Sequence, residues 1–259
     1  MPVTWSVVLP YYNETGYLRP TLESLLAQEL RGFRLILVDN ASTDGSGDLA
    51  RAITAAHPDI EALHLAESRP GKINALQRGL AAVSTEFVTF CDADTFYPPH
   101  YLRRCNELFA SSGAAAVMAM DLPQDHEGPA AQRKRAKVMA VSRLLSRQTH
   151  TGGFGQSFRT DILRKAGGFS AGLWPFVLED HEVMQRVFKL GSSAYAPDLW
   201  CVPSTRRADR SGVSWTTAEQ VLYHLTPFAL KDWFFYSFLA RRFAARALDN
   251  AKLREKSWG

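Results

Sequence analysis

The chain has 259 residues and a mass of 28.9 kDa, with 46% apolar and 22% charged residues, so it can bury a full core and gross disorder is excluded. Its net charge of +4 is uneven, because residues 204–259 carry ten Lys or Arg against five Asp or Glu, and residues 1–203 carry twenty against twenty-one. A basic C-terminal segment suits phosphates, anionic lipids or nucleic acid, and the sign alone does not choose among them.

Short β-branched runs alternate with segments of helical periodicity through the first 110 residues. Such alternation predicts a parallel sheet with helices on both faces, joined by right-handed crossovers. An apolar run at 114–120 predicts a fifth central strand, buried on both faces. The expected strands are 4–9, 33–38, 60–65 and 87–91, and the expected helices are 18–30, 46–56, 72–83 and 99–110.

Helical patterns dominate after residue 121. Glycines at 152–155 predict a turn, and Pro227 predicts a break in a long helical segment that starts at Thr217. No internal repeat or linker is visible, so we expect one catalytic domain at 1–216 and a C-terminal helical segment at 217–259. The remaining predicted helices are 129–148, 161–166 and 180–190, with a polar loop at 124–128.

Polar clusters follow each of the four predicted strands. Ligands of open α/β sheets collect at the carboxyl ends of the strands, so residues about 80 positions apart are expected to line one cleft. The clusters are Asn13-Glu14, Asp39-Asn40, Gly71-Lys72 and Asp92-Ala93-Asp94.

Six short motifs between residue 4 and about residue 190 carry a family resemblance. They are Val7–Glu14, Val38–Ser46, Gly71–Leu76, Asp92–Asp94, Gly152–Gly155 and Glu179–Glu182. In this order and spacing they resemble the family 2 glycosyltransferases. The resemblance implies the GT-A fold, a Rossmann-like mostly parallel α/β sheet, and transfer of a sugar from a nucleotide diphosphate. Neither a dinucleotide fingerprint nor a Walker A loop competes with this interpretation.

The acidic motif after the fourth strand is the expected cation site. Asp92 and Asp94 point to the same side of an extended segment, so their hard oxygens could meet one divalent cation together with diphosphate oxygens and water. The resemblance implies that Asp92 and Ala93 bind the nucleotide and that Asp94 binds Mn²⁺ or Mg²⁺. The alternative is an acidic turn that only faces solvent.

The resemblance also implies a nucleotide site at the ends of the first three strands. Asp39 could accept a hydrogen bond from the base while Tyr11 or Tyr12 stacks on it, although an Asx-turn is the plain alternative for Asp39. Gly71 could let the backbone approach the nucleotide, and Lys72 adds a charge at a helix start, unless it is simply a surface lysine. Asn40 is left out of the site. The remaining nucleotide-binding residues are Pro10 and Glu14.

An inverting transfer needs a carboxylate that removes the proton of the acceptor hydroxyl. Asp180 matches the position of this base in the family, although Glu179 and Asp180 could also serve only as charges at a helix start. The residues assigned to the acceptor or diphosphate side are Gly153, Glu179, Arg207 and Arg210. No catalytic role is assigned to His150 or His181.

The predicted function is metal-dependent, inverting transfer of one sugar from a UDP- or GDP-type donor to an acceptor hydroxyl of a glycan or lipid, with no nucleic-acid partner. A sugar nucleotidyltransferase is the runner-up, but it needs a glycine-rich basic loop after the first strand, which Pro10–Glu14 is not. A non-catalytic sugar-nucleotide binder or membrane scaffold has no need for Asp180. The absence of a Q-x-x-R-W motif argues against polymer synthesis.

The C-terminal segment is expected to bind an anionic membrane surface. Aromatic residues at 233–238 and a stripe through Leu239, Phe243 and Ala247 favour an interface, and six Lys or Arg between 241 and 256 supply charge. The alternative is packing on the catalytic domain or in a homodimer. Three cysteines without a C-x-x-C pair, no visible signal peptide and no apolar run of roughly 20 residues favour a cytoplasmic protein, peripheral on the inner face of the membrane.

Overall fold

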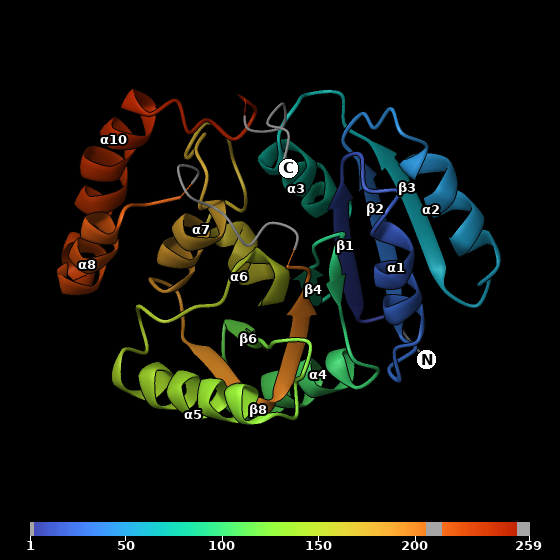
Figure 1. Cartoon of the computed structure of the whole chain (residues 1–259), viewed down its shortest axis with the longest axis horizontal. Helices are drawn as coiled ribbons and strands as arrows, with labels where there is room; N and C mark the ends of the chain where they lie inside the picture. Colours follow the sequence, from blue (N-terminus) through green and yellow to red (C-terminus); the bar gives the residue numbers. More distant parts are fainter. Residues whose placement is uncertain (1–2, 206–213, 253–259) are drawn as a thin grey trace.

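A computed structural model describes residues 3–205 and 214–252, and these form a curled, mostly parallel sheet flanked by helices (Figure 1). The α/β class predicted from the alternating pattern is confirmed. Within the described residues the sheet has the strand order β3-β2-β1-β4-β7-β6-β8-β5. The strands are β1 Trp5–Tyr11, β2 Phe33–Asp39, β3 Glu61–Ala66, β4 Phe87–Phe90, β5 Thr95–Phe96, β6 Ala116–Asp121, β7 Gln156–Arg159 and β8 Ser193–Pro203.

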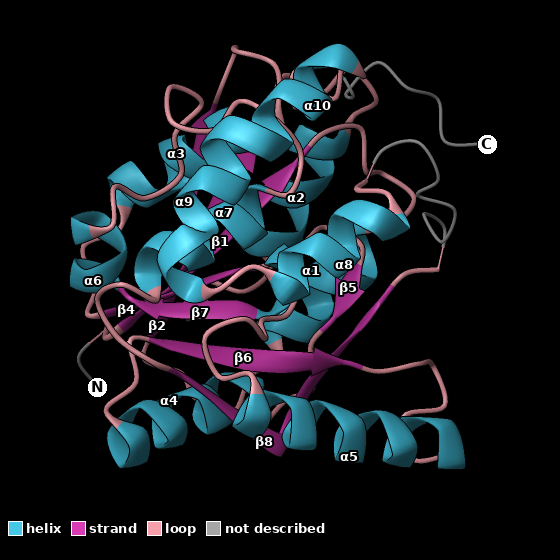
Figure 2. Cartoon of the chain, turned by 90° about the vertical axis from the view of Figure 1, so that its left-hand side faces the viewer, coloured by secondary structure: helices cyan, strands magenta, loops and turns pink. Residues whose placement is uncertain are grey.

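The helices cover both faces of the sheet (Figures 1 and 2). The α-helices are α1 Leu18–Leu26, α2 Ser46–Ala55, α3 Lys72–Ala82, α4 Tyr101–Ser112, α5 Pro129–Leu144, α6 Thr160–Lys165, α7 Glu179–Val187, α8 Thr217–Leu225, α9 Lys231–Trp233 and α10 Ala240–Ala245. The short turns η1 Gly153–Gly155 and η2 Phe228–Leu230 are 3₁₀-helical, and η3 Phe234–Leu239 is a π-helical stretch between α9 and α10.

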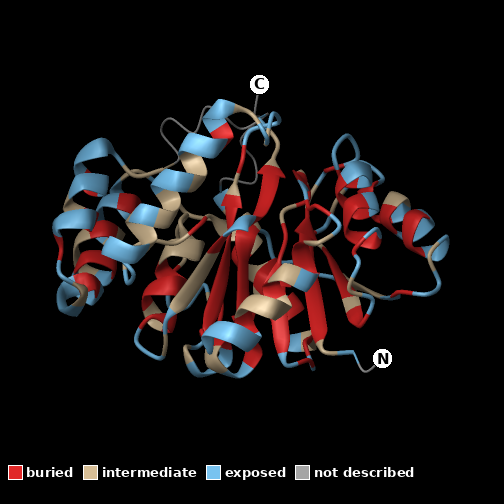
Figure 3. Cartoon of the chain, turned by 90° about the horizontal axis from the view of Figure 1, so that it is seen from below, coloured by how far each residue is buried: buried red, intermediate tan, exposed pale blue. Residues whose placement is uncertain are grey.

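Two apolar layers sandwich the parallel half of the sheet. Successive side chains of a strand point to opposite faces, so Val7 and Leu9 of β1 join α1 and α4 in one layer, whereas Val8 joins α3 and α7 in the other. All seven residues of β1 are buried. Figure 3 shows the buried strands in the interior and exposed residues on the outer sides of the helices. This burial explains why the strands were visible as apolar runs.

The second half of the sheet differs from the prediction. The run at 114–120 does form a strand, β6, but β6 is separated from β4 by β7, which is antiparallel to both. Strand β7 was not predicted, because its Gln156 and Ser157 are polar although both are fully buried. The long strand β8 was also missed, since Pro197 and Asp198 interrupt its apolar pattern.

The aromatic stripe of the C-terminal segment packs against protein. Phe234, Phe235, Leu239 and Phe243 have no exposed surface and form one cluster with Trp174. The prediction that this stripe faces a membrane is therefore wrong for these four side chains, and the alternative of packing on the catalytic domain is the one the structure shows. In the described part of the chain, no helix is both long and apolar enough to span a bilayer.

Candidate active site

The loops that follow β1 and β2 are tied together at the carboxyl edge of the sheet. Tyr11 and Asp39 are register partners at the strand ends. The Asn13 backbone N–H donates to Ser42 Oγ at 3.1 Å, and the Thr43 N–H donates to Asn13 Oδ1 at 2.8 Å. Asn13 has a φ of 52°, in the left-handed region that few residues other than glycine adopt. These bonds hold the first two predicted nucleotide loops side by side.

The predicted base-binding residues differ in exposure. Asp39 Oδ1 accepts from the Ser42 N–H at 2.7 Å, so this carboxylate also holds the loop that follows β2. The Tyr11 ring is only 4% exposed and packs in the core, whereas Tyr12 is half-buried. Tyr12 is therefore the better placed of the two rings for stacking on a base. Two other predicted nucleotide residues, Pro10 and Glu14, are buried.

Asn40 has a structural role in the loop that leads into α3. Its Nδ2 donates to the backbone oxygens of Glu67 and Arg69 at 2.9 and 2.7 Å, and its Oδ1 accepts from the Gly71 N–H at 3.0 Å. Gly71 has a φ of +109°, which a side chain would strain. Asn40 thus fixes the loop that leads into α3, consistent with its exclusion from the predicted site.

The Asp92-Ala93-Asp94 segment connects β4 to β5 and is clamped by buried groups. The Asp92 N–H donates to Tyr97 Oη at 3.0 Å, and Tyr97 Oη donates to the Phe154 carbonyl at 2.9 Å. Thr21 Oγ1 donates to the Ala93 carbonyl at 3.1 Å. Both aspartates stay partly exposed while Ala93 is buried. The clamp links the acidic motif to the glycine turn η1, about 60 residues later in the sequence.

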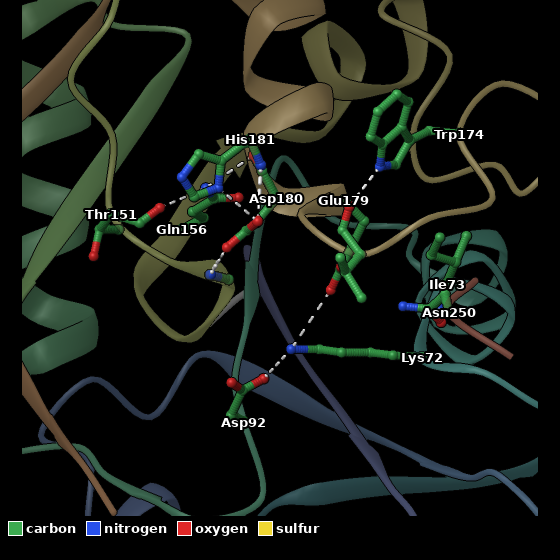
Figure 4. A network of polar contacts seen from close by, with 12 residues as sticks. Lys72, Ile73, Asp92, Thr151, Gln156, Trp174, Glu179, Asp180, His181 and Asn250 are labelled. Atoms are coloured by element: carbon green, nitrogen blue, oxygen red, sulfur yellow. Dashed lines mark hydrogen bonds and ion pairs between the residues drawn. The ribbon is translucent and has the colours of Figure 1, made fainter. Parts of the chain in front are cut away.

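Lys72 lies between two carboxylates at this edge (Figure 4). Its Nζ is 2.6 Å from Asp92 Oδ1 and 3.8 Å from Glu179 Oε1. Burial lowers the pKa of Lys72, but the charges of Asp92 and Glu179 outweigh it and raise the pKa above its ordinary value. Burial raises the pKa of Glu179 despite the nearby Lys72 charge. Lys72 joins the acidic motif to the start of α7 through these ion pairs, although its side chain is 35% exposed.

Asp180 is held through both carboxylate oxygens (Figure 4). The Gly153 N–H donates to Oδ2 at 2.8 Å, and His181 donates to Oδ1 from its backbone N–H at 2.9 Å and its ring Nδ1 at 2.8 Å. Burial works to raise the pKa of Asp180, but the adjacent His181 more than offsets it and holds the pKa well below its usual range. Leu178, which precedes the helix, has a strained φ of 63°. Asp180 is therefore an oriented, ionised carboxylate.

Other aromatic rings pack around the His181 ring. The His150 and Trp215 rings stand perpendicular to it, with centroids at 4.1 and 4.7 Å. His150 Nε2 is 3.4 Å from Tyr223 Oη, and its Nδ1 is 3.2 Å from the Thr151 carbonyl. Sequence reasoning assigned no catalytic role to His150, Trp215 or Tyr223, because His150 lies far from the other two in the sequence and the three share no motif.

The end of the described chain returns to the start of α3. Asn250 Oδ1 accepts from the Ile73 N–H at 3.1 Å, and the Asn250 N–H donates to the Pro175 carbonyl at 2.9 Å. The same Oδ1 lies 2.9 Å from the position that a Cβ on Gly71 would take. The sequence carried no signal for this contact, which joins residues 177 positions apart.

The fit of a divalent cation depends on the acidic motif. Asp92 and Asp94 supply hard oxygen donors on one short segment, which is the donor type that Mg²⁺ and Mn²⁺ prefer. In residues 3–205 and 214–252 no group of three His, Cys, Asp or Glu side chains could hold a metal ion. The predicted diphosphate-side residues Arg207 and Arg210 lie outside the described part of the chain.

The family model for glycosyl transferase family 2 matches residues 6–167, which include every strand-end motif described above. The chain belongs to glycosyl transferase family 2. It is 34% identical over 113 residues to an uncharacterized glycosyltransferase of Nostoc, a match that covers 44% of this chain and 35% of that protein. The match thus spans about a third of that relative's length.

Solved structures share the fold of this chain. The mannosyltransferase PcManGT of Pyrobaculum calidifontis, in complex with GDP-Man and Mn²⁺, has a TM-score of 0.68 at 22% identity. The match covers 95% of this chain and 74% of the PcManGT chain. TarS of S. aureus, in complex with UDP-GlcNAc, has a TM-score of 0.62 at 18% identity. The match covers 93% of this chain and 73% of the TarS chain. These likenesses confirm the GT-A fold.

His150 should make the stability of the folded protein sensitive to mild acid. Burial and the neighbouring His181 lower the pKa of His150 from 6.5 to about 3, so the ring is neutral when folded. The unfolded chain binds more protons between these two values, so this contribution to stability is complete above pH 6.5 and is lost as the pH falls towards 3. The loss should reach about 2 kcal/mol between pH 7 and pH 4.5.

Thermal unfolding of His150→Phe between pH 4.5 and 7 checks this expectation. The variant should lose part of the pH slope of the melting temperature that the wild type shows. A His100→Gln variant, altered outside this cluster, serves as the matched control and should keep the slope. An unchanged slope in His150→Phe would show that His150 is not the group responsible.

Proposed function

We propose that this protein is a metal-dependent, inverting transferase that moves one sugar from a nucleoside diphosphate to an acceptor hydroxyl. The observation that carries the proposal is the placement of an oriented carboxylate, Asp180, beside Lys72 and the acidic motif at Asp92 and Asp94. A protein that only bound nucleotide would not need this third carboxylate, which is held apart from the two carboxylates of the acidic motif.

The donor would bind across the strand ends. Asp39 and Tyr12 are placed for the base and ribose, with Gly71 at the approach to the diphosphate. The complexes of PcManGT with GDP-Man and of TarS with UDP-GlcNAc support a nucleotide-sugar donor of the GDP or UDP type. The choice of UDP or GDP and of the sugar is part of the proposal, because a few side-chain contacts decide which donor an enzyme accepts.

Asp94, with Asp92, would hold Mn²⁺ or Mg²⁺ together with diphosphate oxygens. When bound, the cation supplies positive charge that stabilises the departing nucleoside diphosphate. The Mn²⁺ in the PcManGT complex supports this assignment. Lys72 adds a second positive charge next to Asp92, and it orients that carboxylate through their 2.6 Å contact.

Asp180 would act as the general base. Its carboxylate takes the proton of the acceptor hydroxyl, the hydroxyl oxygen forms a bond to the anomeric carbon, and the bond from that carbon to the diphosphate oxygen breaks with its electron pair on the leaving group. Attack on the side opposite the leaving group inverts the anomeric configuration. The ionised state of Asp180 supports this role, since a protonated acid could not accept the proton.

Release of nucleoside diphosphate tests the proposal. A panel of UDP- and GDP-sugars is incubated with the protein and Mn²⁺ or Mg²⁺, with and without candidate glycan and lipid acceptors. We expect acceptor-stimulated release of UDP or GDP that stops with EDTA. Release of pyrophosphate from a nucleoside triphosphate and a sugar phosphate would identify a nucleotidyltransferase instead, and binding without turnover would identify a non-catalytic sensor.

The acceptor side of the proposal is a membrane surface with a lipid or lipid-linked acceptor. Leu225, Leu230 and Trp233 are 74%, 54% and 50% exposed, and the Arg147 guanidinium lies 5.0 Å over the Phe228 ring, which joins the end of α5 to η2. We call Arg147, Leu225, Leu230 and Trp233 the basic apolar face. Figure 2 shows α5, α8 and α9 on the same side of the molecule. The buried free cysteines support a cytoplasmic enzyme.

Sedimentation with vesicles tests the basic apolar face. The protein should pellet with vesicles rich in anionic phospholipid and be partly released by high salt, because each cation near the headgroups contributes about 1 kcal/mol. A Leu225→Glu, Trp233→Glu double variant should bind at least tenfold more weakly. Val3→Glu, a matched charge on another exposed apolar residue, should bind like the wild type. Equal binding by the wild type, the double variant and Val3→Glu would refute membrane binding by the basic apolar face. Loss of a homodimer in the double variant would identify this face as a subunit contact.

A further inference from the structure

We propose that His181 is a positioning residue for Asp180, and that it leaves Oδ2 as the oxygen that receives the acceptor's proton. The inference rests on the function proposed above, in which Asp180 is the base. It assigns the two carboxylate oxygens different tasks, which the position of Asp180 in the sequence does not do.

The hydrogen bonds at Asp180 distinguish its two oxygens. Oδ1 accepts from both the backbone N–H and the ring Nδ1 of His181, which fills the two lone-pair sites of a carboxylate oxygen. Oδ2 accepts only from the Gly153 N–H within the part of the chain that the structure describes. Oδ2 therefore keeps one lone pair for a proton from a third group.

Asp180 Oδ2 and Lys72 Nζ both lie beside Gly153. A Cβ built on Gly153 would lie 3.9 Å from Asp180 Oδ2 and 3.5 Å from Lys72 Nζ, so this glycine borders both groups. A side chain at residue 153 would occupy the space beside the two groups that the proposed reaction uses. The free lone pair of Oδ2 is thus near the charge expected to face the donor, whereas Oδ1 is turned towards His181.

The ring of His181 packs against three other aromatic rings. His150 and Trp215 contact it edge to face, and the Tyr223 ring lies at 6.4 Å. His150 is itself held between the Thr151 carbonyl and the Tyr223 hydroxyl. Because burial keeps His150 neutral, it adds no charge next to His181. The packing restricts the ring to the orientation in which Nδ1 points at Asp180.

The direction of the electrostatic effect shows what His181 contributes. Its hydrogen bond and charge stabilise the ionised form of Asp180, which makes Asp180 a weaker base. The benefit must therefore be orientation, since a base that is misplaced by about 1 Å can lose on the order of 10² in rate. Loss of His181 should lower kcat without weakening donor binding, and by less than loss of Asp180.

Imidazole ¹⁵N NMR of the full chain tests the contact without any substrate. A ring that donates from Nδ1 to Asp180 must carry its proton on Nδ1, and Asp180→Ala should abolish that preference. Assignment of the His181 signals uses their loss in His181→Gln. A His181 ring that carries its proton on Nε2 and none on Nδ1 in the wild type, or no response to Asp180→Ala, would overturn the proposal.

A matched pair of variants tests the consequence. Asn places its amide nitrogen near the Nδ1 position of histidine, whereas the longer Gln places it near Nε2. With UDP-GlcNAc or GDP-mannose as donor and Mn²⁺, His181→Asn should keep most of the activity. His181→Gln and His181→Phe should lower kcat about 10- to 100-fold with unchanged donor KM. Equal kcat in the Asn and Gln variants would contradict a role for Nδ1, at melting temperatures matched to the wild type.

The Asp180→Asn variant separates this inference from the proposed function. If Asp180→Asn turns over donor at the wild-type rate, Asp180 is not the base and the proposed mechanism fails, whatever His181 does. If Asp180→Asn is inactive while His181→Gln keeps full activity, the mechanism stands and only the positioning role of His181 is refuted.

Discussion

Replacing Asp180 by Asn is expected to lower kcat by about 10² to 10⁴, with nearly unchanged affinity for nucleotide. Asn keeps the shape of the side chain, and its one carbonyl oxygen can accept either from the Gly153 N–H or from His181, so the fold should be kept while the hydrogen bonds on one side are lost. The amide cannot take a proton from the acceptor hydroxyl at neutral pH. Steady-state release of nucleoside diphosphate gives kcat, and calorimetric titration with nucleotide gives the affinity.

Asp161→Asn provides the matched control for this variant. Asp161 lies in the first turn of α6 and pairs with Lys165 on the surface, so the same chemical change there should leave kcat within about twofold of the wild type. A variant at Asp180 that binds the donor poorly but turns over normally at saturation would make Asp180 a binding residue.

Replacing Asp94 by Ala is expected to abolish metal-dependent nucleotide binding. The cation would be shared between carboxylates of the acidic motif and the diphosphate, so loss of one carboxylate leaves few protein ligands for it. Asp92 cannot compensate fully, because its Oδ1 is already paired with Lys72. Calorimetric titration with and without Mn²⁺ gives the ratio of the two affinities for UDP or GDP. We expect this ratio to be at least tenfold smaller in Asp94→Ala than in the wild type.

The control for Asp94→Ala is Asp125→Ala, which removes a carboxylate from an exposed loop before α5. Its titration should match that of the wild type. Unchanged Mn²⁺ dependence in Asp94→Ala itself would contradict the assignment of the cation to the acidic motif. Comparison of melting temperatures guards against a trivial loss of fold, since the Ala93 carbonyl in the same segment is bonded to Thr21.

The C-terminal segment illustrates how a correct local prediction can accompany a wrong assignment of what individual side chains contact. Its helical character and the break at Pro227 are both present, as the periodicity and the proline predicted. The aromatic stripe was assigned to a membrane because its amphipathic pattern has the same form for any apolar partner. In the structure Trp174 and its neighbours are that partner, and Asn250 then reaches the start of α3.

The missed residues of the site share one property. His150, Trp215, Tyr223 and Asn250 act through contacts between segments that lie far apart in sequence. No periodicity or spacing rule connects such residues, because their proximity follows from how β7 and β8 complete the sheet and how the last helices pack against it. The burial of polar side chains also follows from how distant segments pack. Gln156 is fully buried, although no apolar pattern in the sequence predicts it.

The amino-acid sequence by itself determined the parallel half of the sheet, the family and the order of the motifs along it. Strands buried on both faces need continuous apolar runs, and strand ends need turn residues, so both leave local traces at 4–9, 33–38 and 87–91. Only the tertiary structure decided that β7 runs antiparallel, that Lys72 contacts Asp92 and Glu179, and that His181 holds Asp180. Hydrogen bonds and ion pairs act over about 3 Å, a separation that the folded chain sets and that local sequence patterns do not encode.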